Sequence, residues 1–453
     1  MLFSLTNPEV AIMMMGIFLF AVLLGFPIAF TLMAMGLGFG YYAYFDPTKM
    51  EHLFDNRIFQ LFVQNTYTVM DNNVLTAVPL FLFMGYLVER AGIVAKLFFA
   101  IRLASHKLPA SMAVAALITC ALFSTATGII GAVVTLMGLL AWPAMIKAGY
   151  DKKFASGIIC SGGCLGILIP PSIMLIVYSV IAQLSPLRLF AAAIFPGLML
   201  AGLYIGYAII RAWMNPSIAP KPAAEEIPPT AVIMKEVLVS FLPLFSLIIL
   251  VLGTILAGIA TPAEAAAVGA FGSLVLSYFY KTLKWKNFKE SVFLTAKTTA
   301  MIMWLFIGSW TFASVFSYLG GHEVFEHFFK SLNLQPWQFL VITQLIIFLL
   351  GWPLEWTEIL IIFVPIFLPL VEFFGVNPYF FAMLIALNLQ TSFLTPPMAM
   401  SAYYLKGVQS KNVELMQIFG GIMPFLGIVI LAMVLMYLFP GIALWLPETL
   451  FAN

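Results

Sequence analysis

The sequence predicts an all-α polytopic membrane protein, and three observations lead to this fold class. Hydrophobic residues make up 63% of the 453 positions and charged residues only 9%, whereas a soluble domain carries roughly 25% charged residues. Apolar stretches long enough to span a bilayer as helices recur along the chain. Several of them contain prolines or glycines in mid-run, and broken helices of this kind are typical of secondary transporters.

Charge, cysteines and the first residues narrow the class further. The net charge is only +2 and no basic stripe is present, so we expect no nucleic-acid partner. The cysteines Cys120, Cys160 and Cys164 sit in apolar segments with no histidine nearby. We interpret them as small core residues and not as metal ligands. No basic region precedes the first apolar run, which we interpret as a spanning helix rather than a cleaved signal peptide.

The apolar segments divide the chain into two halves of six segments each. We predict a first half at 1–214, a polar, Pro-rich cytoplasmic linker at 215–235 and a second half at 236–453. The apolar runs of the first half lie near 8–24, 28–45, 73–89, 112–142, 155–183 and 190–213. Those of the second half lie near 237–258, 263–280, 292–319, 337–371, 379–405 and 419–446.

The two halves share landmarks at one spacing. Pro143, Gly149 and Pro170 each have a counterpart of the same type 226 residues later. The counterparts are Pro369, Gly375 and Pro396. Three landmarks at a single gapless offset, with matching hydropathy around them, predict an internal structural repeat of the kind that secondary transporters carry.

The positions of Lys and Arg predict how the halves are oriented. Basic residues flank both ends of 112–142, and basic residues near helix ends favour the cytoplasmic side. Segment 112–142 must then enter and leave from the cytoplasm, and its counterpart 337–371 from outside. Because both segments break in mid-run, we predict two re-entrant helical hairpins. Five spanning helices remain in each half, and this odd number predicts an inverted repeat.

Four breaks at predicted membrane depth carry the candidate chemistry: Ser124–Gly128, Gly166–Ser172, Gly351–Glu355 and Thr391–Pro397. Breaks at this depth are tolerated only inside protein or around a wet cavity. A proline leaves the carbonyl four residues earlier unpaired, and unwound carbonyls with Ser and Thr hydroxyls suit Na⁺. The half-helix N-termini beyond the breaks suit a carboxylate. The alternative is that each Pro-Pro pair is only a kink in a packed helix.

Three motifs together carry a resemblance to a known family. They read GILIPPS at 166–172, TPP at 395–397 and TPAEAAAVG at 261–269. Over essentially the whole chain, the sequence resembles the large (M) permease subunit of tripartite ATP-independent periplasmic transporters. The resemblance implies an elevator mechanism in the bacterial inner membrane, with Na⁺ as the coupling ion and no other cofactor. It also implies a small four-helix membrane subunit, a periplasmic solute-binding protein and a small organic acid as solute.

The resemblance further implies two sodium sites, where the hairpin tips face the unwound helices. The residues that match the first site are Ser124, Thr127, Gly128, Gly166 and Pro170. The residues that match the second are Gly351, Thr357, Thr391, Thr395 and Pro396. The first tip carries Ile129 and Ile130 where hydroxyls are frequent in the family, so we expect backbone carbonyls to contribute there. The second tip reads Glu355-Trp356-Thr357 where many members have Asp-Pro-Thr, which we expect to alter substrate size or polarity.

The candidate substrate contacts are Ser172, Glu355, Asn388 and Ser392. Structural roles are the alternatives for some polar residues of these segments. Glu355 and Glu358 sit at a predicted helix start, where carboxylates favour the dipole, and Asn388 could bond a neighbouring helix instead. We interpret Glu264 as a cap, because Thr261-Pro262-Ala263-Glu264 has the capping-box pattern.

Three other functions are alternatives to this one. A stand-alone sodium/dicarboxylate symporter shares the broken hairpins but needs no partner subunit. A polytopic membrane enzyme needs catalytic side chains at membrane depth, and we predict that the histidines lie in loops. The histidines are His52, His106, His322 and His327. A channel is disfavoured because no ring of charge lines a predicted helix. We therefore predict a transporter and not an enzyme.

Overall fold

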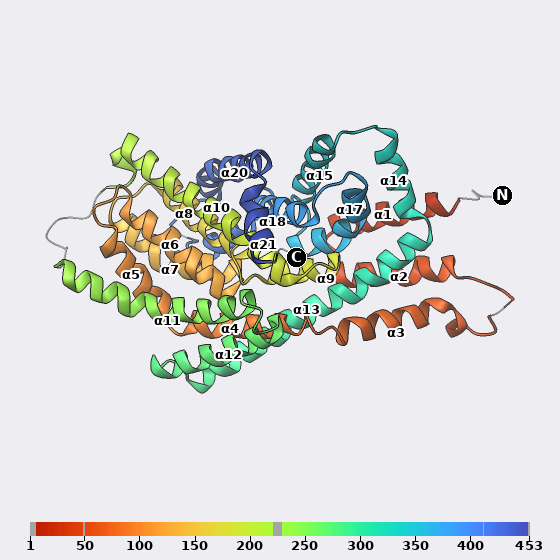
Figure 1. The fold of residues 1–453 in the computed structure, drawn as a ribbon, viewed down its shortest axis with the longest axis horizontal. Helices are drawn as coiled ribbons and strands as arrows, with labels where there is room; N and C mark the ends of the chain where they lie inside the picture. The colour runs from red at the N-terminus through yellow and green to blue at the C-terminus, as the bar shows by residue number, and fades with distance from the viewer. Residues whose placement is uncertain (1–5, 49, 221–228, 411, 452–453) are drawn as a thin grey trace.

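The computed structural model describes residues 6–48, 50–220, 229–410 and 412–451, and within these ranges every regular element is helical (Figure 1). The predicted all-α fold class is therefore confirmed. Part of the predicted linker, 221–228, lies outside the described residues. The helix before it ends at Met214 and the helix after it begins at Thr230.

The α-helices that precede this gap range from 10 to 29 residues in length. Helices α4 and α5 meet at an angle of 64° at a break of two residues. In chain order the elements are α1 Asn7–Leu23, α2 Ile28–Ala43, a 3₁₀ turn Leu53–Asp55, α3 Arg57–Met70, α4 Ala77–Arg90, α5 Ile93–Ala104, α6 Ser111–Thr127, α7 Ile130–Lys147, α8 Lys152–Cys164, a 3₁₀ turn Leu165–Ile167, α9 Ile173–Ala182, α10 Pro186–Met214 and a 3₁₀ turn Pro216–Ile218.

The α-helices after the gap range from 3 to 34 residues in length. They are α11 Thr230–Leu256, α12 Pro262–Phe279, α13 Trp285–Tyr318, α14 Gly321–Ser331, α15 Pro336–Leu350, α16 Trp356–Glu358, a π-helix Ile359–Phe363, α17 Val364–Phe373, α18 Pro378–Leu394, α19 Met400–Val408, α20 Leu415–Leu438 and α21 Gly441–Leu450. Helix α14 carries His322 and His327, so the prediction that all four histidines lie in loops was wrong for these two.

Several helices are long and apolar enough to cross a membrane. Seven of the described helices meet this criterion, or eight if the bent pair α4–α5 is one span. The seven are α7, α10, α11, α12, α13, the continuous run Trp356–Phe373 and α20. Helices α1 and α2, with 17 and 16 residues, are close to the lower limit for a span. The chain is thus a multi-pass membrane protein, while the finer count of ten spans and two re-entrant hairpins stays a prediction.

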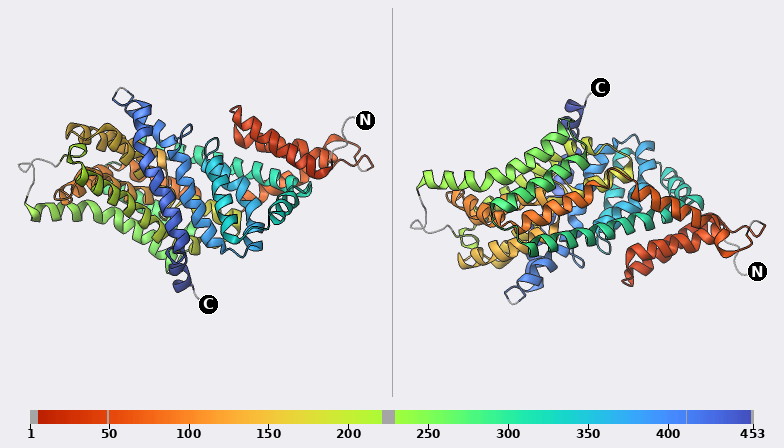
Figure 2. Two further views of the ribbon diagram at one scale, coloured as in Figure 1. Left: turned by 90° about the horizontal axis from the view of Figure 1, so that it is seen from above. Right: turned by 90° about the horizontal axis from the view of Figure 1, so that it is seen from below.

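The two helices that lead into the Pro-Pro breaks form the centre of the molecule. Every residue of Phe154–Cys164 in α8 and of Phe380–Leu394 in α18 is buried. Helix α8 packs on α6, α7 and α20, and α18 packs on α15, α10 and α20. Figures 1 and 2 show this central group with α13 crossing beside it and with α11 and α12 on its outside. A helix that is apolar and buried all round faces protein on every side.

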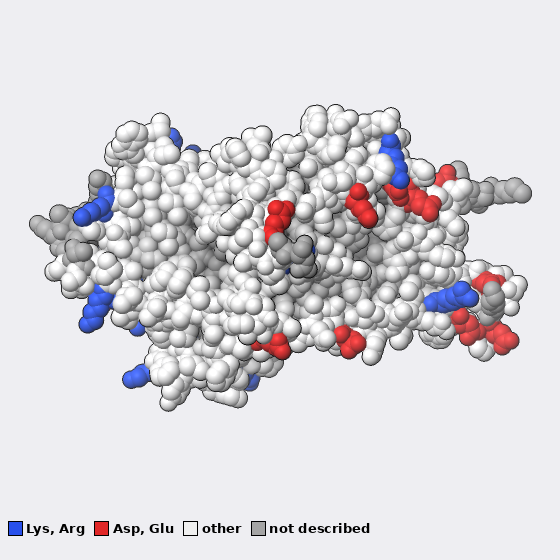
Figure 3. Space-filling model, viewed as in Figure 1, with Lys and Arg blue, Asp and Glu red and all other residues white. Residues whose placement is uncertain are grey.

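Charged side chains are unevenly distributed along the molecule. On the face drawn in Figure 3, Lys and Arg lie mainly toward the end that carries α5 and the start of α11. Asp and Glu lie mainly toward the other half, and the surface between them is largely uncharged. Basic residues are enriched on the cytoplasmic side of membrane proteins, and a cytoplasmic location of the α5 end stays a prediction.

Candidate functional site

The first helix tip is formed where α6 ends and α7 begins. Helix α6 ends at Thr127, Gly128 closes the turn with its N–H bonded to the Ser124 carbonyl at 2.8 Å, and α7 starts at Ile130. The hydroxyls of Ser124 and Thr127 are fully enclosed and have no hydrogen-bond partner. Buried polar atoms normally have partners, so two unpartnered hydroxyls at one turn are free to bind an ion.

The first tip rests on the break that follows α8. A Cβ atom added to Gly166 would lie 2.7 Å from the Cβ of Ser124 and 3.2 Å from its carbonyl oxygen. Glycine is therefore required for the tip to approach this closely. After the 3₁₀ turn and Pro170-Pro171, the Ser172 hydroxyl donates to the Ile167 carbonyl at 2.6 Å, and α9 starts at the next residue. The structure thus brings Ser124, Thr127, Gly128 and Gly166 of the predicted first site together.

The second tip is formed between α15 and α16. A Cβ added to Gly351 would lie 2.9 Å from the Cβ of Ser392 in α18, so this tip also approaches its broken helix through a glycine. The serine and the glycine have changed places: the tip supplies serine in the first pair and glycine in the second. The Thr357 hydroxyl and one oxygen of Glu358 are enclosed without a hydrogen-bond partner, as at the first tip.

The second break has a chain of hydroxyls along the end of α18. The Thr391 hydroxyl donates to the Asn388 carbonyl at 2.6 Å, and the Ser392 hydroxyl donates to the Leu389 carbonyl at 2.7 Å. The Thr395 hydroxyl donates to the Thr391 carbonyl. These hydroxyls stabilise the helix end before Pro396-Pro397, and their oxygens retain lone pairs for a cation.

Asn388 has strong partners on a neighbouring helix. Its amide nitrogen donates to the backbone carbonyl of Gln344 at 2.6 Å and to the Gln344 side-chain oxygen at 2.9 Å. These bonds join α18 to α15, which is the helix-bonding role that the sequence left open. Gln390, one turn away from the break, is fully buried and neither its oxygen nor its nitrogen has a partner.

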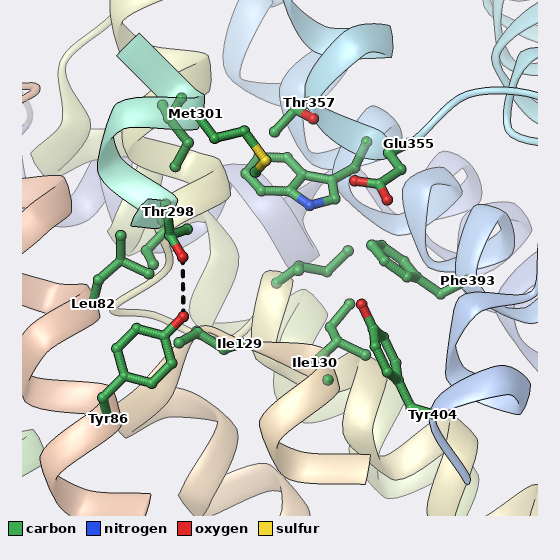
Figure 4. Close-up of a pocket in the computed structure, with 16 residues that line it drawn as sticks. Leu82, Tyr86, Ile129, Ile130, Thr298, Met301, Glu355, Thr357, Phe393 and Tyr404 are labelled. Carbon is green, nitrogen blue, oxygen red and sulfur yellow. Dashed lines mark hydrogen bonds between the residues drawn. The ribbon is translucent and has the colours of Figure 1, made fainter. Parts of the chain in front are cut away.

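A cavity of about 250 Å³ lies between the two tips (Figure 4). It is smaller than the roughly 300–1,000 Å³ typical of drug-sized ligands, which suits a small metabolite. Residues from both tips, both breaks and helices α4 and α13 form its walls. They are Leu82, Tyr86, Gly128, Ile129, Ile130, Gly131, Ile167, Ile173, Thr298, Met301, Ile302, Glu355, Trp356, Thr357, Phe393 and Tyr404.

Of the predicted site residues, Gly128, Thr357 and Glu355 line the cavity itself. The other predicted site residues are not among the wall residues. Glu355 is the one wall residue with a formal charge at neutral pH, and no Lys, Arg or His is among the wall residues. A carboxylate that entered would therefore depend on helix N-termini and bound cations for positive charge.

Helices α4 and α13 contribute wall residues that the sequence analysis missed. The Tyr86 hydroxyl of α4 lies 3.1 Å from the Thr298 hydroxyl of α13 (Figure 4), and Met301 follows on α13. Tyr86 and Thr298 are polar residues inside apolar helices, and this was the available sequence signal. No helix break or motif lies at either position. Among the described residues, no group of three or more His, Cys, Asp or Glu could hold a metal ion.

The predicted capping role of Glu264 is confirmed. Its carboxylate accepts bonds of 2.8 Å from both the N–H and the hydroxyl of Thr261, and α12 starts between them at Pro262. This exposed carboxylate lies at a helix end, far in the sequence from both tips. Its hydrogen bonds to Thr261 explain its position.

Comparison with known proteins places the chain among transporter permeases. It is 28% identical over 388 residues to the C4-dicarboxylate TRAP transporter large permease protein DctM of Pseudomonas aeruginosa, covering 85% of this chain and 88% of that protein. It is 30% identical over 385 residues to the sialic acid TRAP transporter large permease protein SiaM of Vibrio cholerae, covering 84% and 87%. It is 28% identical over 386 residues to the isethionate TRAP transporter permease protein DctMQ of Oleidesulfovibrio alaskensis, covering 84% and 59%.

Two solved structures share the fold. The YdaH transporter of Alcanivorax borkumensis superposes with a TM-score of 0.61 at 15% identity, covering 96% of this chain and 99% of that one. MtrF of Neisseria gonorrhoeae superposes with a TM-score of 0.55 at 13% identity, covering 98% and 96%. At these identities the likeness concerns the fold alone.

The family follows from the sequence match. The family described as tripartite ATP-independent periplasmic transporter, DctM component, matches residues 15–442. The relatives are transporter permeases and not enzymes, which confirms the prediction that this chain is not an enzyme. The chain therefore belongs to the DctM component family of tripartite ATP-independent periplasmic transporters.

Proposed function

We propose that this chain is the large membrane subunit of a sodium-coupled, binding-protein-dependent importer of a small organic acid. The observation that carries the proposal is the cavity between two helix tips, each seated on a broken helix through a glycine–serine contact. The names of the relatives, which include C4-dicarboxylate, sialic acid and isethionate transporters, support an anionic solute.

The two tips would hold the coupling ions. We propose that Ser124, Thr127 and Gly128 of the first tip bind one ion together with Gly166 and the carbonyls before Pro170. We propose that Gly351 and Thr357 of the second tip bind the other together with Thr391, Thr395 and the carbonyls before Pro396. Enclosed hydroxyls without partners support this assignment at Ser124, Thr127 and Thr357, since such oxygens are stabilised by a cation that replaces the missing donor.

Sodium entry supplies enough free energy for strong accumulation. Two Na⁺ that enter with one monocarboxylate move one net positive charge, which is worth about 2.3 kcal/mol per 100 mV. A roughly tenfold sodium gradient adds about 2.7 kcal/mol for the two ions. The sum of about 5 kcal/mol supports a solute gradient of roughly three to four orders of magnitude.

We propose an inverted repeat that works as an elevator. The 226-residue offset, the matching glycine–serine contacts and the helix pairs α6–α7 and α15–α17 support it. The tips with α8, α9, α18 and α19 would move together with the solute, and the outer helices would form the scaffold. Alternating access by movement of one part against another is the usual consequence of such repeats.

We further propose two protein partners and a bacterial inner-membrane location. The large apolar surface of α11 and α12, which includes Leu238, Phe245 and Phe271, is suited to a small four-helix membrane subunit or to lipid. The relative named DctMQ, of which this chain covers 59%, is compatible with a second membrane component in one chain. A periplasmic solute-binding protein would deliver the acid to the cavity.

Uptake by the reconstituted complex tests the proposal. Transport into proteoliposomes should require both a sodium gradient and the binding protein. Full-rate uptake in potassium or choline medium would show that sodium is not the coupling ion. Cysteines placed at Lys107 and Lys147, on the two flanks of the α6–α7 pair, should both be labelled from the cytoplasm; labelling from opposite sides would exclude the hairpin.

A further inference from the structure

Tyr404 is a wall residue of the cavity that the proposed mechanism does not use. It lies in α19, the helix that follows the Pro396-Pro397 break, and its side chain lines the cavity between the tips. The residue is 39% exposed. Its hydroxyl makes no hydrogen bond within the described part of the chain. The cavity wall therefore contains a phenol whose hydrogen-bonding capacity is free for a solute.

The backbone of the first tip fixes the position of this phenol. A Cβ atom added to Gly131, in the first turn of α7, would lie 3.0 Å from the Cζ atom of Tyr404 and 3.2 Å from both Cε atoms. Because Cζ carries the hydroxyl, the polar end of the ring is the part that lies against α7. Helices α7 and α19 also pack on each other. A ring held this closely keeps its hydroxyl at the wall of the cavity.

Glu355 lies on the same side of the cavity as Tyr404. It is the residue before α16, it is half-buried, and its charge acts on the Tyr404 phenol. In the view of Figure 4 the Glu355 carboxylate and the Tyr404 hydroxyl both point into the cavity, on the side away from the bonded pair of Tyr86 and Thr298. Within the described residues, no hydrogen bond or salt bridge reaches the Glu355 carboxylate.

The chemistry of these two side chains selects what can bind between them. An ionised carboxylate only accepts hydrogen bonds, whereas a phenol both donates and accepts. A second carboxylate cannot donate to Glu355 and is repelled by it. A hydroxyl group can donate to Glu355 and accept from Tyr404, and an ammonium group can donate to both. The wall supplies no Lys, Arg or His to fill this role, so the donor must come from the solute.

We propose that Tyr404 and Glu355 together bind a hydroxyl or ammonium group of the transported acid. This inference rests on the proposed function and names its solute class, a small acid that carries a hydrogen-bond donor beside its acid group. The donor faces Glu355, and the acid group points away from that carboxylate. Tyr404 is then a residue that determines specificity, and Gly131 positions it.

The test measures equilibrium binding of matched acids to the purified full-length chain by calorimetry at saturating sodium. One set is propionate, lactate and alanine, and the other is succinate, malate and aspartate. Within each set only one substituent changes, from hydrogen to hydroxyl to ammonium. In at least one set a donor-bearing acid should bind about tenfold or more tightly than the plain acid, because a hydrogen bond to a charged group contributes about that factor. Preference for lactate or malate identifies a hydroxyl, and preference for alanine or aspartate identifies an ammonium.

Four variants locate the origin of the preference. Tyr404→Phe removes one unbonded oxygen, so it should fold normally and lower the preference about 2- to 10-fold. Glu355→Gln should also lower the preference, and more strongly for an ammonium than for a hydroxyl. Gly131→Ala should lower it by displacing the ring, with no further effect on the preference in the Tyr404→Phe background. As a matched control, Tyr437→Phe in α20, at a residue that is 41% exposed and outside the wall, should keep it.

Equal affinities within both sets would overturn the proposal, and so would a preference that survives Tyr404→Phe unchanged. Failure of the proposed sodium coupling is a separate result. It would appear as affinities that do not depend on sodium, while the ratio of affinities within a set would still report on Tyr404 and Glu355.

Discussion

The contact between Gly166 and Ser124 should control sodium affinity. In Gly166→Ala the new Cβ would lie 2.7 Å from the Cβ of Ser124, closer than real Cβ contacts allow, so the first tip must lift. Overpacking of a well-packed site costs about 1–3 kcal/mol, which is roughly a 5- to 150-fold shift against the seated tip. The sodium concentration for half-maximal uptake should therefore rise at least about fivefold at matched protein level.

A control and a double mutant separate this effect from general destabilisation. A Cβ at Gly202 in α10 would meet nothing within 4 Å, so Gly202→Ala should leave the sodium dependence unchanged. Ser124→Gly removes the Cβ that the new methyl group would approach most closely, and its shift combined with Gly166→Ala should be smaller than the product of the two single shifts. The packing argument fails if Gly166→Ala titrates like Gly202→Ala, or if the two single effects simply multiply.

Three further substitutions, one of them paired with a control at Glu264, test other parts of the site. Thr395→Val removes one oxygen at constant shape and should raise the half-maximal sodium concentration several-fold, whereas Glu264→Gln, which keeps the capping-box pattern, should leave that concentration unchanged; the reverse pattern would show that the ion site is misplaced. Asn388→Ala leaves the Gln344 acceptors unpaired and should cost about 1–3 kcal/mol, measured as a lower melting temperature; unchanged melting would contradict the role of this bond. Trp356→Ala should enlarge the cavity and shift uptake toward bulkier acids, and unchanged selectivity would mean that the ring does not limit solute size.

Local features of this protein were predictable from sequence because their causes are local. Proline removes a donor and clashes with the preceding turn wherever it occurs, so the breaks at Pro170 and Pro396 could be located without a structure. The helix cap formed by Thr261 and Glu264 spans four residues and could also be predicted from the sequence. The apolar composition determined the membrane class, since a soluble fold could not bury that much apolar surface.

Contacts between distant segments were decided only by the tertiary structure. The tip glycine at 351 and Ser392 meet because α15 and α18 pack together, and no local pattern states which residue faces which. The cavity wall draws Tyr86 and Thr298 from helices 212 residues apart, so neither was recognisable as a site residue. His322 was placed in a loop because a polar segment between apolar runs gives the same signal as a short surface helix.

Glu358 shows most clearly which properties the sequence determined and which the tertiary structure decided. The sequence determined that an acid follows Thr357 at a helix start, where exposed carboxylates are ordinarily stabilised by the dipole. Only the packing of the π-helix on α9, α13 and α17 decided that this acid is buried without a positive partner. Burial and charge pairing depend on which chain segments exclude water from a group, and that is a property of the whole fold and not of neighbouring residues.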